Sequence, residues 1–345
     1  MISPKVTIII VTRNSQRFMA SCLDSIYAQT YRDFQVLVID NDSHDGTVEF
    51  VRSNYPQTVM FVNNKNSGFA KANNQGIRLI KSPFFLLCNP DIILEPDWLE
   101  KIMSIAELEQ NNDCASFGGK LLKLKLINAE IGETEKTEII DSCGLKFLKN
   151  HRFVEWGAGD PAAEYNQAQE VFGHSGALVL LRKESLEQVV IQDRHHYTGD
   201  FLDSNFFFYK EDVDLAWRLR LQGFRSMFIP EAVAYHLRTF PAAQNNRLGE
   251  VVANRRQQND LARYYSYRNH FLVLLGNEYL SNLIIYSPFI AWYELKKFCY
   301  LLIFEIRNLK AIAEVIGMLP QTLAKRRQIF RRAKLKAGDI RKWIS

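Results

Sequence analysis

Residues 84–91 read FFLLCNPD, five apolar side chains followed by a polar turn. A short, uninterrupted apolar run of this kind predicts a strand that is buried on both faces, as strands in parallel sheets are. Pro90 cannot continue a central strand, so the chain turns there and Asp91 lies at the C-terminal end of the strand. Open α/β sheets bind their ligands at that end, where a carboxylate can hold a divalent cation. A turn that merely ends the strand is the alternative interpretation.

Strand and helix patterns alternate on both sides of this run. Strands are predicted at residues 6–11, 34–39, 59–62, 115–122 and 176–181, and helical periodicity at 18–27, 47–51, 69–80 and 182–190. Between residues 126 and 160 the periodicity weakens and turn glycines appear, so we expect a β-hairpin excursion there. Strands that alternate with helices at this spacing predict an α/β fold with a doubly wound, mainly parallel sheet flanked by helices.

Three polar clusters follow three of the predicted strands, at residues 12–14, 40–43 and 89–91. The C-terminal ends of parallel strands face one crevice in a doubly wound sheet, so we expect the three clusters to meet on one ligand. The chain contains neither G-x-G-x-x-G after its first strand nor a P-loop motif. A phosphate would therefore be met by a cation held by Asp91, while Asp40 would hydrogen-bond a ribose or a base.

A second cluster of acids opens the helix that is predicted from Lys210 onward. Glu211, Asp212 and Asp214 fall in its first turn, where the positive end of the helix dipole favours negative charge. These acids can be ordinary N-terminal helix charges, or they can face the crevice and take part in chemistry. The sequence pattern alone leaves both interpretations open.

The composition is that of a globular protein with a sizeable core, since 47% of the 345 residues are hydrophobic and 12% are aromatic. Five cysteines, an odd number without a C-x-x-C pair, argue against a disulfide scaffold or a zinc knuckle and fit a reducing compartment. The first residues do not have the pattern of a signal peptide. We therefore expect a protein that stays on the cytoplasmic side.

Positive charge is concentrated at the C-terminus. Residues 320–345 contain nine Lys or Arg residues and one acid, so the net charge of this segment is +8. The net charge of the whole chain is +5, so the remainder is slightly acidic. Residues 283–304 are apolar except for Glu294, Lys296 and Lys297, and no run of 18 apolar residues exists that would span a membrane. A helix lying in the membrane interface, followed by a basic tail on an anionic membrane surface, is the expectation. Helices packed against the rest of the chain or a partner subunit are the alternative.

Several ordered motifs match one known family. They lie at residues 6–14, 38–47, 66–76, 89–91, 141–144, 173–177 and 206–215, with Arg218, Gly223 and His236 following. With these motifs the chain resembles the inverting family-2 glycosyltransferases of the GT-A fold, and more narrowly the rhamnosyltransferase-like group of bacterial surface-polysaccharide assembly. The resemblance implies a GT-A domain over residues 1–238, with a nucleotide-binding half to about residue 122 and an acceptor half after it. Residues 239–345 would form a helical, basic extension.

The resemblance also implies a role for each matching residue. Asp212 matches the general base, with Glu211 beside it. Asn89-Pro90-Asp91 replaces the more usual Asp-x-Asp and leaves Asp91 as the metal and diphosphate contact, and His236 matches a position that completes the metal shell. The remaining nucleotide-sugar contacts would be Thr12, Asn14, Asp40, Asp42, Ser43, Asn73 and Asn89. Candidate acceptor contacts are His174, for which a local turn hydrogen bond is the alternative, and Arg268, which would meet a lipid diphosphate.

The implied chemistry fits these residue types. Inverting transfer needs a base for the acceptor hydroxyl and positive charge on the departing diphosphate. Mg²⁺ or Mn²⁺ is the expected cofactor, since a hard cation with phosphate and water ligands accepts an amide oxygen at Asn89. The implied donor is a nucleotide-diphosphate sugar, with dTDP-rhamnose favoured over another hexosyl or a galactofuranosyl donor. The implied acceptor is a hydroxyl of a glycan or of a polyprenyl-diphosphate-linked glycan, at the cytoplasmic face of the plasma membrane.

Two further expectations concern partners. A non-catalytic subunit that binds nucleotide sugars is the alternative to an enzyme, although the set of Asp91, Asp212 and His236 favours the enzyme. No nucleic-acid partner is expected, because the basic residues of the tail are not set in a recognisable binding fold. The oligomeric state is left open, a homodimer included.

Overall fold

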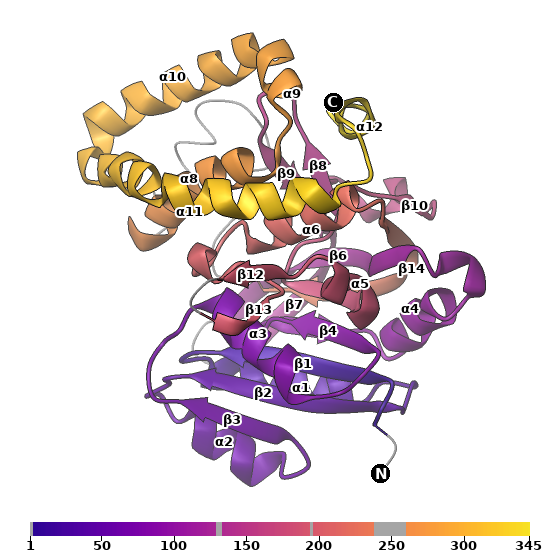
Figure 1. Ribbon diagram of the computed structural model, residues 1–345. Coiled ribbons are helices and arrows are strands. Elements are labelled where there is room, and N and C mark those ends of the chain that lie inside the picture. The colour runs from indigo at the N-terminus through magenta and orange to yellow at the C-terminus, as the bar shows by residue number, and fades with distance from the viewer. Residues whose placement is uncertain (1–2, 129–132, 194–195, 238–259) are drawn as a thin grey trace.

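The computed structural model describes residues 3–128, 133–193, 196–237 and 260–345. Its main strands are β1 (Val6–Thr12), β2 (Phe34–Asn41), β3 (Val59–Asn63), β4 (Phe84–Cys88), β5 (Ile92–Leu94), β6 (Cys114–Asn128), β7 (Glu133–Ser142), β10 (Gln169–Glu170), β11 (Leu178–Arg182) and β14 (Arg225–His236). They form one sheet in the order β10-β14-β6-β11-β4-β1-β2-β3, with β5 paired to β14 and β7 to β6 (Figure 1). Two separate antiparallel pairs are β8 (Leu145–Phe147) with β9 (Phe153–Glu155) and β12 (Ile191–Asp193) with β13 (His196–Asp200).

Strands β3, β2, β1 and β4 form the parallel part of the sheet that the sequence predicts. Val6 of β1 lies in register with Phe34 of β2 and with Phe84 of β4. All five residues of β4 are buried. The apolar run at residues 84–88 is therefore the central strand that its composition predicts.

The second part of the sheet is mixed. β11 runs antiparallel to β4, where Leu178 pairs with Cys88, and β6 runs antiparallel to β11. β14 then lies parallel to β6. Within residues 126–160, where a β-hairpin was expected, β8 and β9 form an antiparallel pair and β7 pairs antiparallel with β6. β6 itself continues six residues beyond its predicted end at Leu122.

Helices cover both faces of the sheet. They are α1 (Gln16–Tyr27), α2 (Thr47–Asn54), α3 (Phe69–Leu79), α4 (Trp98–Ala106), α5 (Lys183–Gln188) and α6 (Glu211–Leu221). One core joins Val6, Ile8 and Ile10 of β1 to α1, α2 and α4. A second core on the opposite face joins Ile9 of β1 to α3, α5 and α6. This alternation follows from the two-residue period of a strand and confirms the mainly parallel α/β sheet flanked by helices.

The C-terminal region is helical, as expected. It consists of α8 (Asp260–Asn277), α9 (Leu280–Ile285), α10 (Ser287–Phe304), the short turn η4 (Ile306–Leu309), α11 (Lys310–Arg332) and α12 (Ala337–Arg341). α8, α11 and the C-terminal residues share a third core with Trp217 of α6 and Phe147 of β8. α10 lies at the end of the molecule opposite β3 and α2 (Figure 1). Within the described residues, none of the helices combines the length and the apolarity that crossing a bilayer requires.

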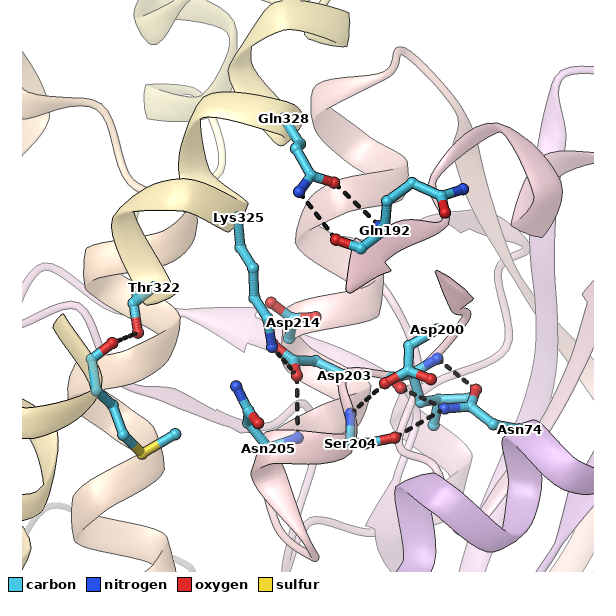
Figure 2. A network of polar contacts seen from close by, with 12 residues as sticks. Asn74, Gln192, Asp200, Asp203, Ser204, Asn205, Asp214, Thr322, Lys325 and Gln328 are labelled. Atoms are coloured by element: carbon cyan, nitrogen blue, oxygen red, sulfur yellow. Dashed lines mark hydrogen bonds and ion pairs between the residues drawn. The ribbon is translucent and has the colours of Figure 1, made fainter. Parts of the chain in front are cut away.

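The basic tail is not a free arm. Lys325 of α11 is buried and pairs with Asp203 at 2.5 Å, and Gln328 exchanges two hydrogen bonds with the backbone of Gln192 (Figure 2). Trp343 packs against the Phe172 ring. The alternative interpretation, in which these helices pack against the rest of the chain, is thus right for α8, α11 and α12. The sequence could not show this, because a buried lysine and an exposed one look alike in a charge count.

Candidate active site

The ends of β1 and β2 place two buried oxygen atoms side by side. Thr12 is in register with Asp40, and both side chains are buried. Asp40 accepts a hydrogen bond from the Ser43 backbone at 2.9 Å through Oδ1, while its Oδ2 and the Thr12 Oγ1 have no hydrogen-bond partner in the structure. Buried polar atoms are normally hydrogen-bonded, so this pair indicates a place where a ligand hydroxyl or amide completes the bonding.

Two loops are tied together above this pair. The Asn14 backbone N–H donates to the Ser43 hydroxyl at 2.8 Å, and the Asn14 side chain accepts from the His44 backbone at 2.8 Å. Asn14 and Asp42 both have positive φ angles, 50° and 72°, which asparagine and aspartate tolerate better than other non-glycine residues. Asn14 and Ser43 therefore shape the rim of the crevice, and Asp42 lies on it in an exposed pair with His44.

The turn after β4 brings Asp91 to the same edge of the sheet. The Asn89 backbone N–H donates to the carbonyl of Ala177, and Ile92 closes the turn by donating to the Asn89 carbonyl. Asp91 Oδ1 lies 3.3 Å from Nε2 of His236, the last residue of β14. The pairing of β14 with β5 places His236 directly opposite Ile92, the neighbour of Asp91, so the predicted site residues Asp91 and His236 do meet.

His236 is held between two carboxylates. Its Nδ1 lies 2.9 Å from Oδ2 of Asp141, at the end of β7. Burial alone would lower the pKa of His236, but the charge of Asp91 and the hydrogen bonds to Asp141 and Asp91 raise it to about 9. Asp141 is absent from the predicted site residues. Its only sequence signal was the motif at residues 141–144, to which no role was given.

Asp91 and His236 carry donor atoms that can bind a divalent cation, provided that Nε2 of His236 releases its proton when the cation binds. A histidine that ligates a metal usually donates its other ring N–H to a carboxylate, which is the relation of His236 to Asp141. In the part of the chain that the structure describes, no group of three or more His, Cys, Asp or Glu side chains is placed to hold a metal ion. Asp91 and His236 could supply two ligands to a cation whose shell is completed by phosphate and water oxygens.

The two candidate catalytic carboxylates at the start of α6, Glu211 and Asp212, lie in different environments. Glu211 is buried and its Oε2 has no hydrogen-bond partner. Burial and the neighbouring charge of Asp212 raise the pKa of Glu211 to about 8, so Glu211 is mainly protonated at neutral pH. Asp212 is more exposed, and its carboxylate accepts from the Gly176 backbone at 3.0 Å and the Val213 backbone at 2.7 Å. Gly176 adjoins Ala177, so Asp212 lies beside the Asn89 turn.

The wild type is expected to lose stability as the pH rises toward 8, and the Glu211→Gln variant is expected to lack this part of the pH dependence. The folded-state pKa of Glu211, about 8, lies above its ordinary value of 4.5, so between these values the folded chain holds a proton that the unfolded chain has lost. This contribution to the free energy of unfolding is complete below pH 4.5 and is lost as the pH rises through 8. Melting temperatures of both proteins at pH 5 and pH 8 test this. If the melting temperatures of wild type and variant differ by the same amount at both pH values, the prediction is wrong.

A loop with unusual backbone angles leads into α6. Phe207, Tyr209 and Lys210 have φ angles of 58°, 67° and 74°, and such conformations cost on the order of 1–3 kcal/mol each. The Phe207 carbonyl accepts a hydrogen bond from the N-terminal residue of α3, Phe69, at 2.6 Å. Asn269 of α8, fully buried, places its Nδ2 within 2.7–3.0 Å of the carbonyl oxygens of residues 206, 208 and 209. The C-terminal region therefore holds the loop that presents Asp212.

Three residues that were predicted as ligand contacts make internal hydrogen bonds in this structure. Arg268 is buried, and its guanidinium donates to Asn269, to Glu314 and to the carbonyl of Asn205, so it supports the loop and is not placed to meet a lipid diphosphate. His174 is buried beside Met227, whose carbonyl lies 3.1 Å from Nε2, and burial lowers the pKa of His174 to about 4. Asn73 is buried in α3 and donates to the Phe69 carbonyl. Residue type alone does not distinguish such internal contacts from ligand contacts.

Comparison with known proteins agrees with this arrangement. The family model described as "Glycosyl transferase family 2" matches residues 7–189. A Rickettsia felis protein described as an uncharacterized glycosyltransferase is 32% identical over 117 residues, which are 34% of this chain and 19% of that protein. The chain thus matches only about a fifth of the length of that relative.

Two solved structures share the fold. GalNAc-T7 crystallised with UDP, GalNAc and Mn²⁺ superposes with a TM-score of 0.55 at 12% identity, over 79% of this chain and 49% of the other. Residues 1–349 of S. aureus TarS superpose with a TM-score of 0.51 at 14% identity, over 92% of this chain and 80% of the other. At such low identity the likeness is one of fold alone, and it confirms the expected GT-A type.

Proposed function

Because the chain belongs to glycosyl transferase family 2, we propose that it transfers a sugar from a nucleotide-diphosphate sugar to an acceptor hydroxyl, with inversion at the anomeric carbon. The observation that carries this proposal is the convergence of three features on one edge of the sheet. These are the unpartnered oxygens of Thr12 and Asp40, the pair of Asp91 and His236, and the carboxylate of Asp212. They supply the nucleotide contact, the diphosphate contact and the base that such a transfer needs.

The nucleotide would bind at the ends of β1 and β2. Asp40 and Thr12 would accept and donate the hydrogen bonds that their unpartnered oxygens lack, to a ribose or a base. Asn14 and Ser43 would keep the rim in shape through the bonds that join their two loops. Asp42 and Asn89 border the same crevice and complete the proposed donor contacts.

The diphosphate would lie against the turn after β4. A bound Mg²⁺ or Mn²⁺ would neutralise the negative charge that develops on the leaving diphosphate. Asp91 and His236 would hold that cation, and Asp141 would keep the ring of His236 oriented. Asp212 would take the proton of the acceptor hydroxyl, on the opposite side from the leaving group. Two backbone N–H groups fix its orientation for this step.

The donor and the acceptor are proposed from the resemblance of the motifs. The rhamnosyltransferase-like pattern makes dTDP-rhamnose the first donor to test, with other hexosyl and galactofuranosyl nucleotides beside it. The acceptor would be a glycan or a polyprenyl-diphosphate-linked glycan of surface-polysaccharide assembly. The test is transfer from a panel of labelled nucleotide sugars into lipid extract, with Mg²⁺, Mn²⁺ or EDTA. Label that enters the lipid fraction from one donor supports the proposal, whereas nucleotide-sugar binding without transfer from any donor would favour a non-catalytic subunit.

Asp91→Ala is expected to remove the metal-dependent part of nucleotide binding. Loss of a ligand or of its support typically lowers metal affinity or activity by about 10–100-fold, so the variant should bind a nucleoside diphosphate about 10-fold or more weakly in Mn²⁺. Its affinity in EDTA should equal that of the wild type, because Thr12 and Asp40 are unchanged. Calorimetric titration with and without EDTA measures both values.

The matched control for this titration is Glu109→Ala. Glu109 is exposed and precedes β6, at the opposite edge of the sheet from the crevice. Its replacement should leave both affinities unchanged. An Asp91→Ala variant that still gains affinity on addition of Mn²⁺ would show that the cation is held elsewhere.

A further inference from the structure

Helices α9 and α10 expose an unusual number of large apolar side chains. Ile284, Phe289, Trp292, Leu295, Ile303 and Ile306 are each more than half exposed. Among the residues of α10, only Leu301 is buried. Monomeric soluble proteins rarely expose contiguous apolar patches of more than a few hundred Å², and larger ones mark interaction surfaces. We call the exposed side of α9, α10 and η4 the outer face.

α10 is attached to the molecule by its polar side chains. Glu294 lies 3.1 Å from Nε2 of His270 on α8, and both groups are largely buried. Glu305, at the end of α10, is buried beside Asn308, whose side chain donates to it at 2.8 Å. The ammonium of Lys297 lies 4.5 Å from the centre of the Tyr267 ring of α8. α10 thus turns its two acids and the buried Leu301 toward the molecule, whereas most of its large apolar side chains are exposed.

The charges that remain on the outer face are positive. Between Leu280 and Leu309 the exposed Lys, Arg, Asp or Glu side chains are Lys296 and Arg307, while the two acids of that stretch are largely buried. Aromatic and aliphatic side chains flanked by lysine and arginine are typical of helices that lie in the headgroup region of an anionic bilayer.

We propose that the outer face binds the surface of an anionic lipid bilayer. Trp292 and its aliphatic neighbours enter the boundary between headgroups and acyl chains, and Lys296 and Arg307 meet the anionic headgroups. The protein lies on the membrane through α10, and the basic residues of α11 that are packed against the core contribute little. This assigns membrane binding to residues 280–309 and not to the C-terminal tail.

Vesicle flotation of the full chain tests the proposal. The wild type should float with vesicles of phosphatidylcholine and phosphatidylglycerol, and less with phosphatidylcholine alone. The double variant Trp292→Glu/Ile303→Glu should partition at least about 10-fold more weakly, because it places two charges in the apolar boundary. Lys296→Glu/Arg307→Glu should lose the preference for anionic vesicles. Val59→Glu, at an exposed position of β3 at the other end of the molecule, is the matched control and should float like the wild type.

Three further readouts keep the outcomes distinct. Melting temperatures should be unchanged in every variant, because the altered side chains are exposed. Flotation of Trp292→Glu/Ile303→Glu at the wild-type level would overturn the proposal, as would a wild type that does not float. A dimer in light scattering that Trp292→Glu/Ile303→Glu converts to a monomer would assign the face to a second copy and also overturn it. Nucleotide binding, measured in parallel, tests the proposed transfer separately, since the crevice is unaltered.

Discussion

Asp212→Asn is expected to lower the rate of transfer by about 10²–10⁴-fold, the usual contribution of a general base. Asparagine keeps the shape of the side chain, but only its one amide oxygen can accept, so it keeps one of the two hydrogen bonds that Gly176 and Val213 donate to the carboxylate. It cannot take a proton from the acceptor hydroxyl, so the chemical step fails while the donor site is intact. Turnover of a labelled donor measures the rate of transfer, and calorimetric titration measures the affinity for the nucleotide separately.

The neighbouring Glu211→Gln variant is the matched control for this experiment. Because the pKa of Glu211 is raised to about 8, its side chain is already mainly neutral at pH 7, and an uncharged amide of the same shape replaces it closely. Transfer by Glu211→Gln should therefore remain near the wild-type rate. A loss as large as that of Asp212→Asn would exchange the roles of the two residues. Loss of nucleotide binding in Asp212→Asn would show that Asp212 is structural.

Lys325→Met is expected to have the largest effect on stability. Removing one partner of a buried ion pair typically costs about 3–5 kcal/mol, because the other charge is left in a poorly solvated place. Asp203 is buried, and burial together with the nearby charge of Asp214 opposes the pull of Lys325 and raises the pKa of Asp203 (Figure 2). Equilibrium unfolding in urea should show a lower midpoint for the variant.

The second variant in this test is Lys325→Met/Asp203→Asn, which removes both charges. It should recover part of the lost stability, since no unpaired carboxylate remains. Lys334→Met, at an exposed position, should change the free energy of unfolding by less than about 0.5 kcal/mol. If Lys325→Met lowers the free energy of unfolding by less than about 1 kcal/mol, the pair of Lys325 and Asp203 contributes no more than an exposed ion pair does.

The parallel part of the sheet could be predicted because its strands carry their own signal. Residues 84–88 are apolar without interruption, and only a strand covered on both faces buries all of them. The direction of β11 could not be predicted in this way. A buried strand has the same composition whether it is parallel or antiparallel to β4, and β11 is antiparallel.

The geometry of the candidate site could be predicted where a polar residue stands at the end of a strand. Asp40, Asp91 and His236 are at such positions, and the structure brings the last two together. Asp141 and Asn269 were missed because their importance lies in contacts with residues far along the chain. Arg268 is the opposite case. Its charge suggested a ligand contact, but its side chain is buried and donates a hydrogen bond to the carbonyl of Asn205 in the loop before α6.

The bonds of Asn269 join the loop before α6 to a helix that is synthesised later. Its amide reaches loop residues that precede it by 60 to 63 positions, and the loop needs this support to hold its positive φ angles. N-terminal segments fold first on the ribosome, so the parallel strands with the donor crevice can assemble while α8 is still unmade. The emerging chain would then bind nucleotide before it can react. Ribosome-bound intermediates that end before residue 260 should hold the donor without consuming it.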